Sequence, residues 1–439
     1  MQSAQTVIEA RWIIPIVPKN TVLEHHAVVI DQGRILAVLP VSEARARYAA
    51  AETVSLKESV LMPGLVNLHS HAAMNLLRGL GADLPLMDWL TQKIWPAEGK
   101  LMSAEFVEEG AHLAGREMAA AGITCTSDQY FFPDAAARGL RRAGLRCAVS
   151  GIVIGFPSAW ASDEGDYLTK AETLLQNASN DPFVTATIAP HAPYTVSDSA
   201  LERCAALSAE YNAPIHIHLQ ETAGEVTDSI KAYGERPSAR LARCGLMNER
   251  LIAVHSVHMN DEDIARIAEA GASVCHCPSS NLKLASGFAP IAAFMKAGIN
   301  LGIGTDSVAS NDKLDLLGET RLAALLAKGA TGDPTVAKVH DMLEAATLGA
   351  ARALKLDHEI GSLEKGKAAD IIAVDLSSVC TLPVLDPAAQ LLYSAGRENV
   401  THTWVSGNLI ASRQQISRFI DLADIQSLNR TAEQWHNRL

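Results

Sequence analysis

The stretch Leu65-Val-Asn-Leu-His-Ser-His-Ala72 joins a run of apolar residues to two histidines that are separated by a single residue. In an extended chain the side chains of residues i and i+2 lie on the same face. His69 and His71 would then point the same way, close enough together to hold one ion. Two polar residues at the start of a loop would give the same short pattern, so other parts of the chain must decide between the two interpretations.

The composition is that of an ordinary folded protein. The 439 residues are 48% hydrophobic and 20% charged, which allows a large core and more than one domain. The formal net charge is −12, and nucleic acid requires a basic surface, so we expect no nucleic-acid partner. Because no apolar run reaches the ~18–20 residues of a membrane-spanning helix, we expect no membrane partner either.

The seven cysteines are scattered along the chain. A disulfide framework would be denser and even in number, and the N-terminal segment does not resemble a signal peptide, so we predict a cytoplasmic location. Only Cys275 and Cys277 lie close together, with His276 between them. No second Cys/His pair of the zinc-finger type follows them, which disfavours a metal site there.

Short apolar runs alternate with helical stretches through the middle of the chain. We expect eight strands from these runs, at residues 61–68, 122–128, 145–154, 183–190, 214–218, 251–255, 272–276 and 299–305. Eight strands separated by helices predict an α/β fold of the (β/α)8 TIM-type barrel class. A doubly wound open sheet is the alternative, but no Gly-x-Gly-x-x-Gly turn follows the first strand.

Both ends of the chain differ from the middle in their residue pattern. Residues 1–60 and 366–439 contain alternating, β-branched segments, and we expect them to form one small β-sandwich domain around a barrel domain at 61–365. The last 20 residues, IDLADIQSLNRTAEQWHNRL, are predicted to form a C-terminal helix.

Polar residues at the ends of the predicted strands form a set. At the ends of five of the eight runs we single out His or Asp side chains as candidates, namely His69, His71, His191, His218, His255 and Asp306. Because TIM-type barrels place functional residues at the carboxyl ends of their strands, we expect these side chains to meet at one rim.

Metal binding explains this set. Zinc binds imidazole nitrogens and a carboxylate oxygen, and a catalytic zinc keeps one position open for water. We therefore expect one divalent metal ion per subunit, most simply Zn²⁺, with His69, His71, His218 and Asp306 as ligands. A second ion would need a bridging anion such as a modified lysine, which neither the fourth nor the fifth strand supplies. His216 shares a face with His218 but lies one layer deeper, so we interpret it as an interior barrel residue.

These residues resemble the amidohydrolase superfamily over nearly the whole chain, including the small-domain phrase that runs from Gly361 to Asp370, GSLEKGKAAD. Within the superfamily the chain is similar to the deaminases of 5′-methylthioadenosine and S-adenosylhomocysteine. The segments that carry this likeness are LHSHAAMNLLRGLGADLPLMDWL, IWPAEGKL, APHAPYTVS, IHLQET, SNLKLASG and GTDSVASND. The resemblance implies a deaminase that acts on a purine nucleoside and forms a homo-oligomer.

The resemblance also implies roles for single residues. Substrate contacts are expected from Trp89 and Glu98 at the ribose, from His191 at the purine, and from Glu221 and Asp306. The expected catalytic residues are Glu221 as a proton shuttle, His255 beside the attacking water, and Asp306 as the acceptor of the water proton. An exposed helix-start residue is the alternative for Glu98, and simple core packing is the alternative for Trp89.

Relatives that prefer S-adenosylhomocysteine can carry arginines after the third strand, whereas residues 149–160 of this chain are apolar and contain none. We therefore expect 5′-methylthioadenosine to be favoured, with S-adenosylhomocysteine and adenosine as other candidates. Two further hypotheses remain. One is a deaminase or chlorohydrolase that acts on an s-triazine or on a free base such as guanine. The other is a metal-free scaffold protein, which the complete His/Asp set disfavours.

Overall fold

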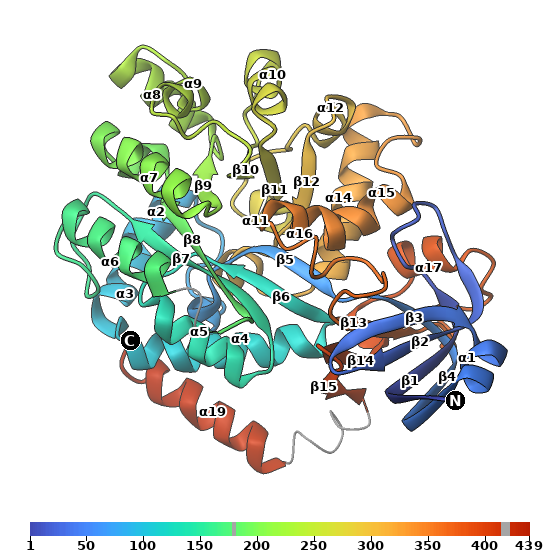
Figure 1. The fold of residues 1–439 in the computed structure, drawn as a ribbon. Helices are drawn as coiled ribbons and strands as arrows, with labels where there is room; N and C mark the ends of the chain where they lie inside the picture. Colours follow the sequence, from blue (N-terminus) through green and yellow to red (C-terminus); the bar gives the residue numbers. More distant parts are fainter. Residues whose placement is uncertain (178–180, 414–421) are drawn as a thin grey trace.

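A computed structural model describes residues 1–177, 181–413 and 422–439 of the chain (Figure 1). Each predicted apolar run supplies one strand of an eight-stranded parallel sheet, and the strands follow one another in chain order. They are β5 (Leu65–Ser70), β6 (Ile123–Asp128), β7 (Arg146–Val153), β8 (Val184–Pro190), β9 (Ile215–Leu219), β10 (Leu251–His255), β11 (Ser273–His276) and β12 (Asn300–Ile303). The predicted (β/α)8 barrel is therefore confirmed.

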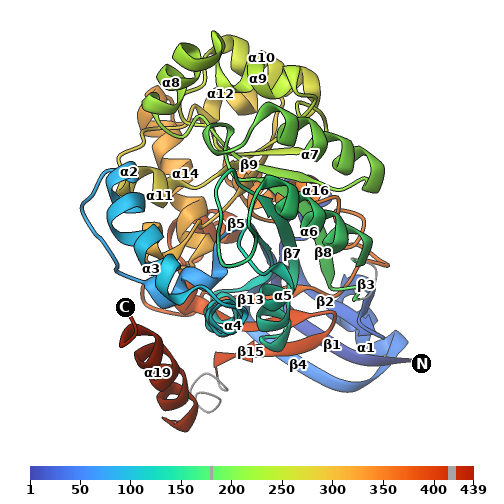
Figure 2. The same ribbon diagram turned by 90° about the vertical axis from the view of Figure 1, so that its left-hand side faces the viewer.

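Helices cover the outside of the barrel (Figures 1 and 2). They include α4 (Ala104–Ala120), α5 (Pro133–Arg142), α6 (Glu164–Asn177), α7 (Asp198–Tyr211), α8 (Ala223–Tyr233), α9 (Pro237–Arg243), α10 (Asp261–Ala270), α12 (Ile291–Lys296), α14 (Leu316–Thr331), α15 (Val339–Glu344) and α16 (Ala350–Ala353). In α4, the hydroxyl of the N-cap residue Ser103 accepts a hydrogen bond from the backbone N–H of Phe106. Residues spaced along one face of α4, among them Phe106 and Ala114, are buried against the barrel.

The rim of the barrel carries shorter elements. The connection from β5 to α4 contains η1 (Ala72–Leu77), α2 (Leu86–Trp89), η2 (Leu90–Ile94) and α3 (Trp95–Leu101), and later connections contain η4 (Pro193–Thr195), α11 (Pro278–Lys283) and α13 (Val308–Asn311). Because all eight strands are parallel, these connections lie at the same end of the barrel as the predicted site residues.

The barrel closes where the first and last strands meet. The Asn67 side chain donates to Thr305 Oγ1 at 2.8 Å and accepts from the Thr305 backbone N–H at 2.9 Å. One residue further on, the backbone N–H of Asp306 donates to the carbonyl of His69 at 3.0 Å. Closure therefore fixes Asp306 beside His69.

The two chain ends build one small domain, as predicted. Within the described residues its strands form a seven-stranded sheet in the order β15-β14-β13-β4-β1-β2-β3. The bounds are β1 (Gln2–Ile13), β2 (Leu23–Asp31), β3 (Arg34–Pro40), β4 (Tyr48–Pro63), β13 (Ile371–Asp375), β14 (Val400–Val405) and β15 (Asn408–Ser412). Helix α1 (Val41–Arg47) packs beside this sheet, whereas α17 (Pro387–Tyr393) and η6 (Arg397–Asn399), between β13 and β14, lie against barrel helices, α17 against α14 and α15 and η6 against α14. The strands of the small domain are hydrogen-bonded into one continuous sheet. The reason is the 16-residue β4, which pairs with β1 on one side and with β13 on the other.

The apolar run at 61–68 is divided between the two sheets, because β4 ends at Pro63 and β5 begins at Leu65. Gly64 makes the crossing, and a Cβ atom there would come within 2.1 Å of Thr124 Oγ1. No other residue fits this close approach of two chain segments.

The predicted C-terminal helix is present as α19 (Leu422–His436), while residues 420 and 421 lie outside the described part of the chain. Trp435 is buried, and its ring contacts the Phe106 ring of α4 at a centroid distance of 5.2 Å. In both ribbon views α19 lies along the outside of the barrel, with its last turn near α3 (Figures 1 and 2). Among the described residues we find no helix that has both the length and the apolar character needed to cross a membrane.

A buried ion pair joins the small domain to the barrel. Arg146, at the start of β7, donates to Asp370 Oδ2 at 3.2 Å, and only 3% and 1% of the two side chains are exposed. Asp370 also accepts from the backbone N–H of Ser406 at 2.8 Å. A charge this deep requires its partner, because an uncompensated buried charge is strongly unfavourable.

We predict that Asp370→Ala lowers the free energy of unfolding by about 3–5 kcal/mol, because it leaves the Arg146 guanidinium buried without its main partner. Urea denaturation followed by fluorescence measures the change. Glu58→Ala is the control, since it removes an ion pair with Arg11 whose side chains are 49% and 44% exposed, and it should cost at most about 1 kcal/mol. Equal losses in the two variants would contradict the prediction.

Candidate metal centre and active site

The Asp306 carboxylate lies between the two histidines of the opening stretch. Asp306 Oδ1 is 3.2 Å from His69 Nε2 and 3.3 Å from His71 Nε2, and the two imidazole rings meet edge to face with centroids 4.7 Å apart. The three residues form one group whose ligand atoms all lie within 4.8 Å of one another. The expectation that His69 and His71 point to one place is confirmed.

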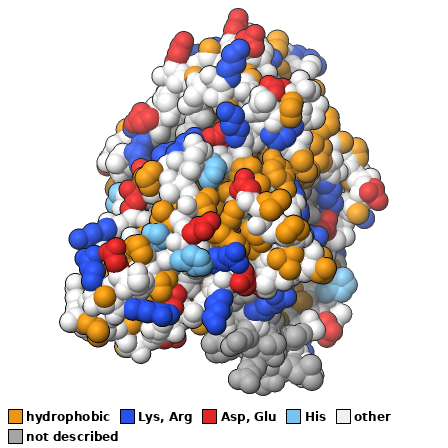
Figure 3. Space-filling view, turned by 90° about the vertical axis from the view of Figure 1, so that its right-hand side faces the viewer, with side chains coloured by type: hydrophobic (Ala, Val, Ile, Leu, Met, Phe, Trp, Pro, Cys, Tyr) orange, Lys and Arg blue, Asp and Glu red, His pale blue; other side chains and the backbone are white. Residues whose placement is uncertain are grey.

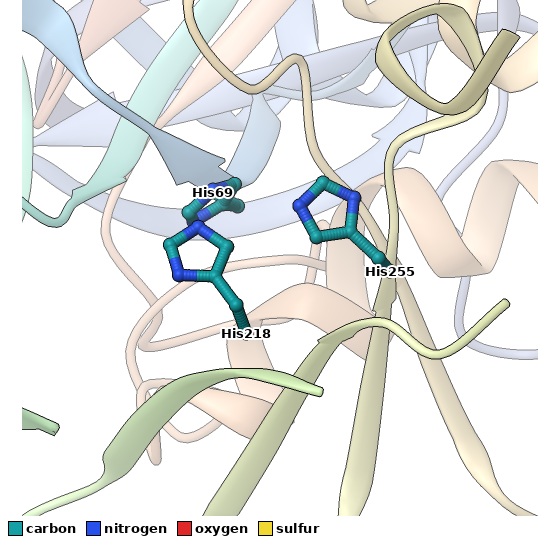
Figure 4. Close-up of side chains that lie close together, drawn as sticks. All are labelled: His69, His218 and His255. Atoms are coloured by element: carbon teal, nitrogen blue, oxygen red, sulfur yellow. The ribbon is translucent and has the colours of Figure 1, made fainter. Parts of the chain in front are cut away.

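His218 and His255 enter the same cluster from β9 and β10. The His218 ring is 4.9 Å from that of His69 and stacks on the His255 ring at 5.4 Å. His69, His218 and His255 form a second group of three nitrogen donors within 4.8 Å (Figure 4). The structure thus brings all four predicted metal ligands together and places His255 directly beside them.

Hydrogen bonds orient the rings of His71 and His218. The Nδ1 atom of His71 donates to the backbone carbonyl of Gln129 at 2.6 Å, and Nδ1 of His218 donates to the carbonyl of His191 at 2.7 Å. A neutral imidazole that carries its proton on Nδ1 has a free lone pair on Nε2. Both rings therefore turn a metal-binding nitrogen towards the cluster, as in known metal sites.

His69 is oriented by His216, a residue deeper in the barrel interior. Its Nδ1 lies 2.8 Å from Nε2 of the fully buried His216, which in turn lies 3.1 Å from Ser127 Oγ through Nδ1. His216 is thus an interior residue, as predicted, and it supports His69. The Nε2 atom of His69 is buried and has no hydrogen-bond partner among the described residues. An unpaired buried nitrogen beside a carboxylate fits a bound divalent cation, and an imidazole and carboxylate donor set fits zinc.

The local electrostatics favour the ligand form at His69, His218 and Asp306, whereas the adjacent Asp306 carboxylate outweighs burial and raises the pKa of His71. Burial lowers the pKa of His69 to about 4, so its ring is neutral at pH 7. Burial alone would raise the pKa of Asp306, but the adjacent His69 and His71 rings outweigh it and hold the pKa well below its usual range. Asp306 Oδ2 also accepts from Ser280 at 2.6 Å and from Ser310 at 3.0 Å. The carboxylate is therefore ionised.

Glu221 and His255 are the predicted proton-handling residues beside the cluster. Both are buried, and His255 Nε2 lies 3.8 Å from Glu221 Oε2. Burial raises the pKa of Glu221, which favours the protonated carboxyl form. His255 Nδ1 donates to Asn281 Oδ1 at 2.7 Å, which leaves Nε2 facing the cluster as an acceptor.

Four residues of the cluster, His71, His218, His255 and Asp306, line one pocket. The predicted substrate residues Trp89, Glu98 and His191 all line it. Trp89 is buried and donates from its indole N–H to the carbonyl of Leu80 at 3.0 Å. The predicted substrate residues and the predicted metal ligands therefore share one pocket.

Glu98 is held by a tyrosine that the sequence did not single out. The Tyr130 hydroxyl donates to Glu98 Oε1 at 2.6 Å. Burial raises the pKa of Glu98 to about 7, and the Tyr130 hydrogen bond opposes part of that shift. One carboxylate oxygen is thus fixed by the protein, and the other is free for a ligand.

The pocket wall after the third barrel strand is apolar. Ile152, Ile154 and Phe156 line it, and the Phe156 ring lies 5.7 Å from that of Trp95. Among the described residues that line the pocket there is no lysine or arginine. The wall therefore suits an uncharged group.

Several residues of the site were missed at the sequence level. Asp128 is buried at the end of β6, where Oδ1 accepts from the backbone N–H of Ala72 at 2.5 Å, and burial raises its pKa to about 6. Gln129 and Tyr130 follow it. The signal was available, since the second apolar run ends in Ser-Asp-Gln-Tyr. The sulfur atoms of Cys275 and Cys277 lie 4.0 Å apart, and neither residue belongs to the two groups of candidate ligands among the described residues.

Comparisons with known proteins agree with this geometry. Residues 60–410 match the model of the family described as the amidohydrolase family. A 5-methylthioadenosine/S-adenosylhomocysteine deaminase from Saccharophagus degradans is 42% identical, covering 97% of this chain and 95% of its own length. An adenosine deaminase from Xanthomonas campestris, solved with bound zinc, has a TM-score of 0.96 and 47% identity over 100% of this chain and 99% of its own. Atrazine chlorohydrolase from Arthrobacter aurescens shares the fold, with a TM-score of 0.88 and 24% identity over 98% and 100% of the two chains.

We predict that protein stripped with a chelator binds one Zn²⁺ per chain, as measured by calorimetry. His71→Ala and His218→Ala should each weaken zinc binding by more than the roughly 10–100-fold typical of residues that only support a ligand. His191→Ala should retain wild-type affinity, because His191 supports His218 through its backbone carbonyl, which alanine keeps. Unchanged affinity in the first two variants would contradict the assignment.

Proposed function

Because the chain belongs to the amidohydrolase family, we propose that it is a zinc-dependent deaminase of an adenine nucleoside. In this proposal the 6-amino group is replaced by a 6-oxo group and ammonia is released. The observation that carries the proposal is the single pocket that holds both the His/Asp cluster and the carboxylate of Glu98. A ribose offers two neighbouring hydroxyls to such a carboxylate, whereas a free base offers none.

The names of the relatives support an adenine nucleoside as the substrate. Among such nucleosides, 5′-methylthioadenosine fits the apolar wall formed by Ile152, Ile154 and Phe156. The amino-acid zwitterion of S-adenosylhomocysteine would be buried beside this wall without a charged partner, which is unfavourable. We therefore place 5′-methylthioadenosine ahead of adenosine and S-adenosylhomocysteine.

We assign His69, His71, His218 and Asp306 as the ligands of one zinc ion. When bound, zinc lowers the pKa of a coordinated water to about 7, which makes a nucleophile available near neutral pH. Three protein groups would then move or orient protons around carbon C6 of the purine. Asp306 accepts the proton of the attacking water on its carboxylate, and His255 Nε2 orients that water.

Glu221 supplies protons to the substrate. Its protonated carboxyl gives a proton to ring nitrogen N1 as C6 is attacked. The water proton accepted by Asp306 passes to the departing amine, and the proton of the newly added hydroxyl returns to Glu221 as the 6-oxo group forms. The net change is one water consumed and one ammonia released. The raised pKa of the buried Glu221 suits this role, because the carboxyl must hold a proton before the attack.

A homo-oligomer is part of the proposal. Figure 3 shows apolar side chains gathered on the face at the right of Figure 1, among acidic and basic side chains. Separately, Val379 and Leu385, between β13 and α17, are 90% and 89% exposed. Exposed apolar groups of this kind are typical of surfaces that bind another protein chain.

We predict that the zinc-loaded protein releases ammonia from 5′-methylthioadenosine and adenosine, and at least tenfold more slowly, in kcat/KM, from S-adenosylhomocysteine, adenine and amino-s-triazines. Glu221→Gln should bind zinc normally and lose all but about 1% of the activity, since a positioned acid contributes about 10²–10⁴-fold. A coupled ammonia assay measures both. Faster turnover of triazines or free bases than of nucleosides would refute the nucleoside assignment.

We predict that Glu98→Ala lowers kcat/KM for adenosine by roughly 10–100-fold, because a hydrogen bond to a charged group is worth about 1.5–3 kcal/mol. The residual activity on free adenine, which has no ribose, should stay within about twofold. Tyr130→Phe serves as a control that keeps the Glu98 carboxylate and removes only its protein partner. Equal losses on adenosine and adenine would exclude a ribose contact.

A further inference from the structure

The seventh barrel strand, β11, ends in His276, which belongs to neither group of candidate metal ligands. The segment that follows it, residues 278–287, nevertheless forms hydrogen bonds to three residues of the site. Resting on the proposed function, we propose that this segment is a positioning element, in which Ser286 orients the carboxyl group of Glu221 and Asn281 orients the imidazole of His255.

Three side chains of the segment each reach a different functional residue. The Ser280 hydroxyl donates to Asp306 Oδ2 at 2.6 Å. Asn281 Oδ1 accepts from His255 Nδ1 at 2.7 Å, and the Ser286 hydroxyl donates to Glu221 Oε1 at 3.2 Å. The segment therefore contacts every residue to which the proposed reaction assigns a proton or the orientation of the water.

The segment is buried, and a backbone hydrogen bond holds its two orienting residues in one turn. Ser280, Asn281 and Ser286 are 0%, 1% and 6% exposed. The backbone N–H of Ser286 donates to the carbonyl of Asn281 at 2.8 Å, so the residues that hold His255 and Glu221 belong to one hydrogen-bonded turn. Left-handed backbone at Ala285 (φ 53°) and Gly287 (φ 127°) turns the chain on either side of Ser286.

His258 ties this turn back to the elements that carry Glu221 and His255. Its Nε2 atom donates to the carbonyl of Ser286 at 2.8 Å. Its own carbonyl accepts from the side chain of Gln220, the neighbour of Glu221, at 2.9 Å. The loops after β9, β10 and β11 are therefore joined to one another by hydrogen bonds.

The hydrogen-bond directions distinguish the two oxygens of Glu221. Because the Ser286 hydroxyl occupies Oε1, the proton that Glu221 exchanges with the substrate is carried on Oε2, the oxygen 3.8 Å from His255 Nε2. Without Ser286 the carboxyl group can rotate, so that neither oxygen is held for proton transfer. The metal ligands His69, His71 and His218 have no contact with Ser286, so zinc binding should not depend on it.

The test is Ser286→Ala in the zinc-loaded full-length protein. We expect kcat for 5′-methylthioadenosine to fall roughly tenfold or more, as for the loss of a hydrogen bond to a charged group. KM should stay within about twofold, with unchanged zinc content and melting temperature. Ser286→Thr, which keeps a hydroxyl, should recover most of kcat. Asn281→Ala should lower kcat by roughly 10–100-fold, as removal of a group that orients a functional histidine does.

Ser279→Ala is the matched control. It removes a hydroxyl from the same helix, at a residue whose side chain is directed to Glu319 of α14, and it should leave kcat within about twofold. In the Glu221→Gln background, Ser286→Ala should add less than a twofold loss, because its effect passes through Glu221. A crystal structure of zinc-loaded Ser286→Ala should find the Glu221 side chain displaced.

Three results would overturn the positioning role: Ser286→Ala matching Ser279→Ala in kcat, a full independent loss in the Glu221→Gln background, or an unmoved Glu221 in the crystal structure. A wild-type protein that releases no ammonia from any nucleoside would instead refute the proposed function. The crystal structure would still decide whether Ser286 holds Glu221, so the two failures are separable.

Discussion

The contact of Asp306 Oδ1 with the Nε2 atoms of His69 and His71, at 3.2 and 3.3 Å, is the interaction on which the rest of the site depends. It joins the first barrel strand to the last, whose backbones meet there through the bond from Asp306 N–H to the His69 carbonyl. Closure of the barrel and assembly of the donor set are thus one event. A barrel left open between β5 and β12 would separate the carboxylate from both rings.

Residues at the ends of three strands adopt backbone conformations that are unfavourable for residues other than glycine. Gln220, His255 and Asp306, at the ends of three strands, have φ values of 50°, 67° and 58°, in the left-handed region that costs a residue other than glycine about 1–3 kcal/mol. Buried hydrogen bonds offset the cost. The Glu225 carboxylate, for example, accepts from the backbone N–H groups of Gln220 and Glu221 at 2.8 and 2.9 Å. At His255 and Asp306 the turn directs the side chain into the pocket. A strand that continued straight would direct these side chains elsewhere.

Sequence patterns predicted the features that repeat or that end a repeat. Eight apolar runs became eight strands, and the His and Asp residues at their ends met at one rim, because parallel strands share a carboxyl end. The supporting contacts could not be predicted in this way. Ser286 meets Glu221 across 65 residues and Tyr130 meets Glu98 across 32, with no periodicity to connect them. In the small domain, too, alternation identifies the strands but not which of them pair.

The carboxyl groups of the pocket differ in protonation because their surroundings differ. Asp306 faces two imidazoles that outweigh its burial and keep it ionised, whereas burial dominates at Glu221 and at Glu98 and raises the pKa of each. Groups of one chemical type whose environments drive their pKa values apart are suited to opposite roles in acid–base chemistry. In the proposed reaction this difference matches the two assigned roles, with Asp306 as the group that accepts a proton from water and Glu221 as the group that gives one to the ring nitrogen.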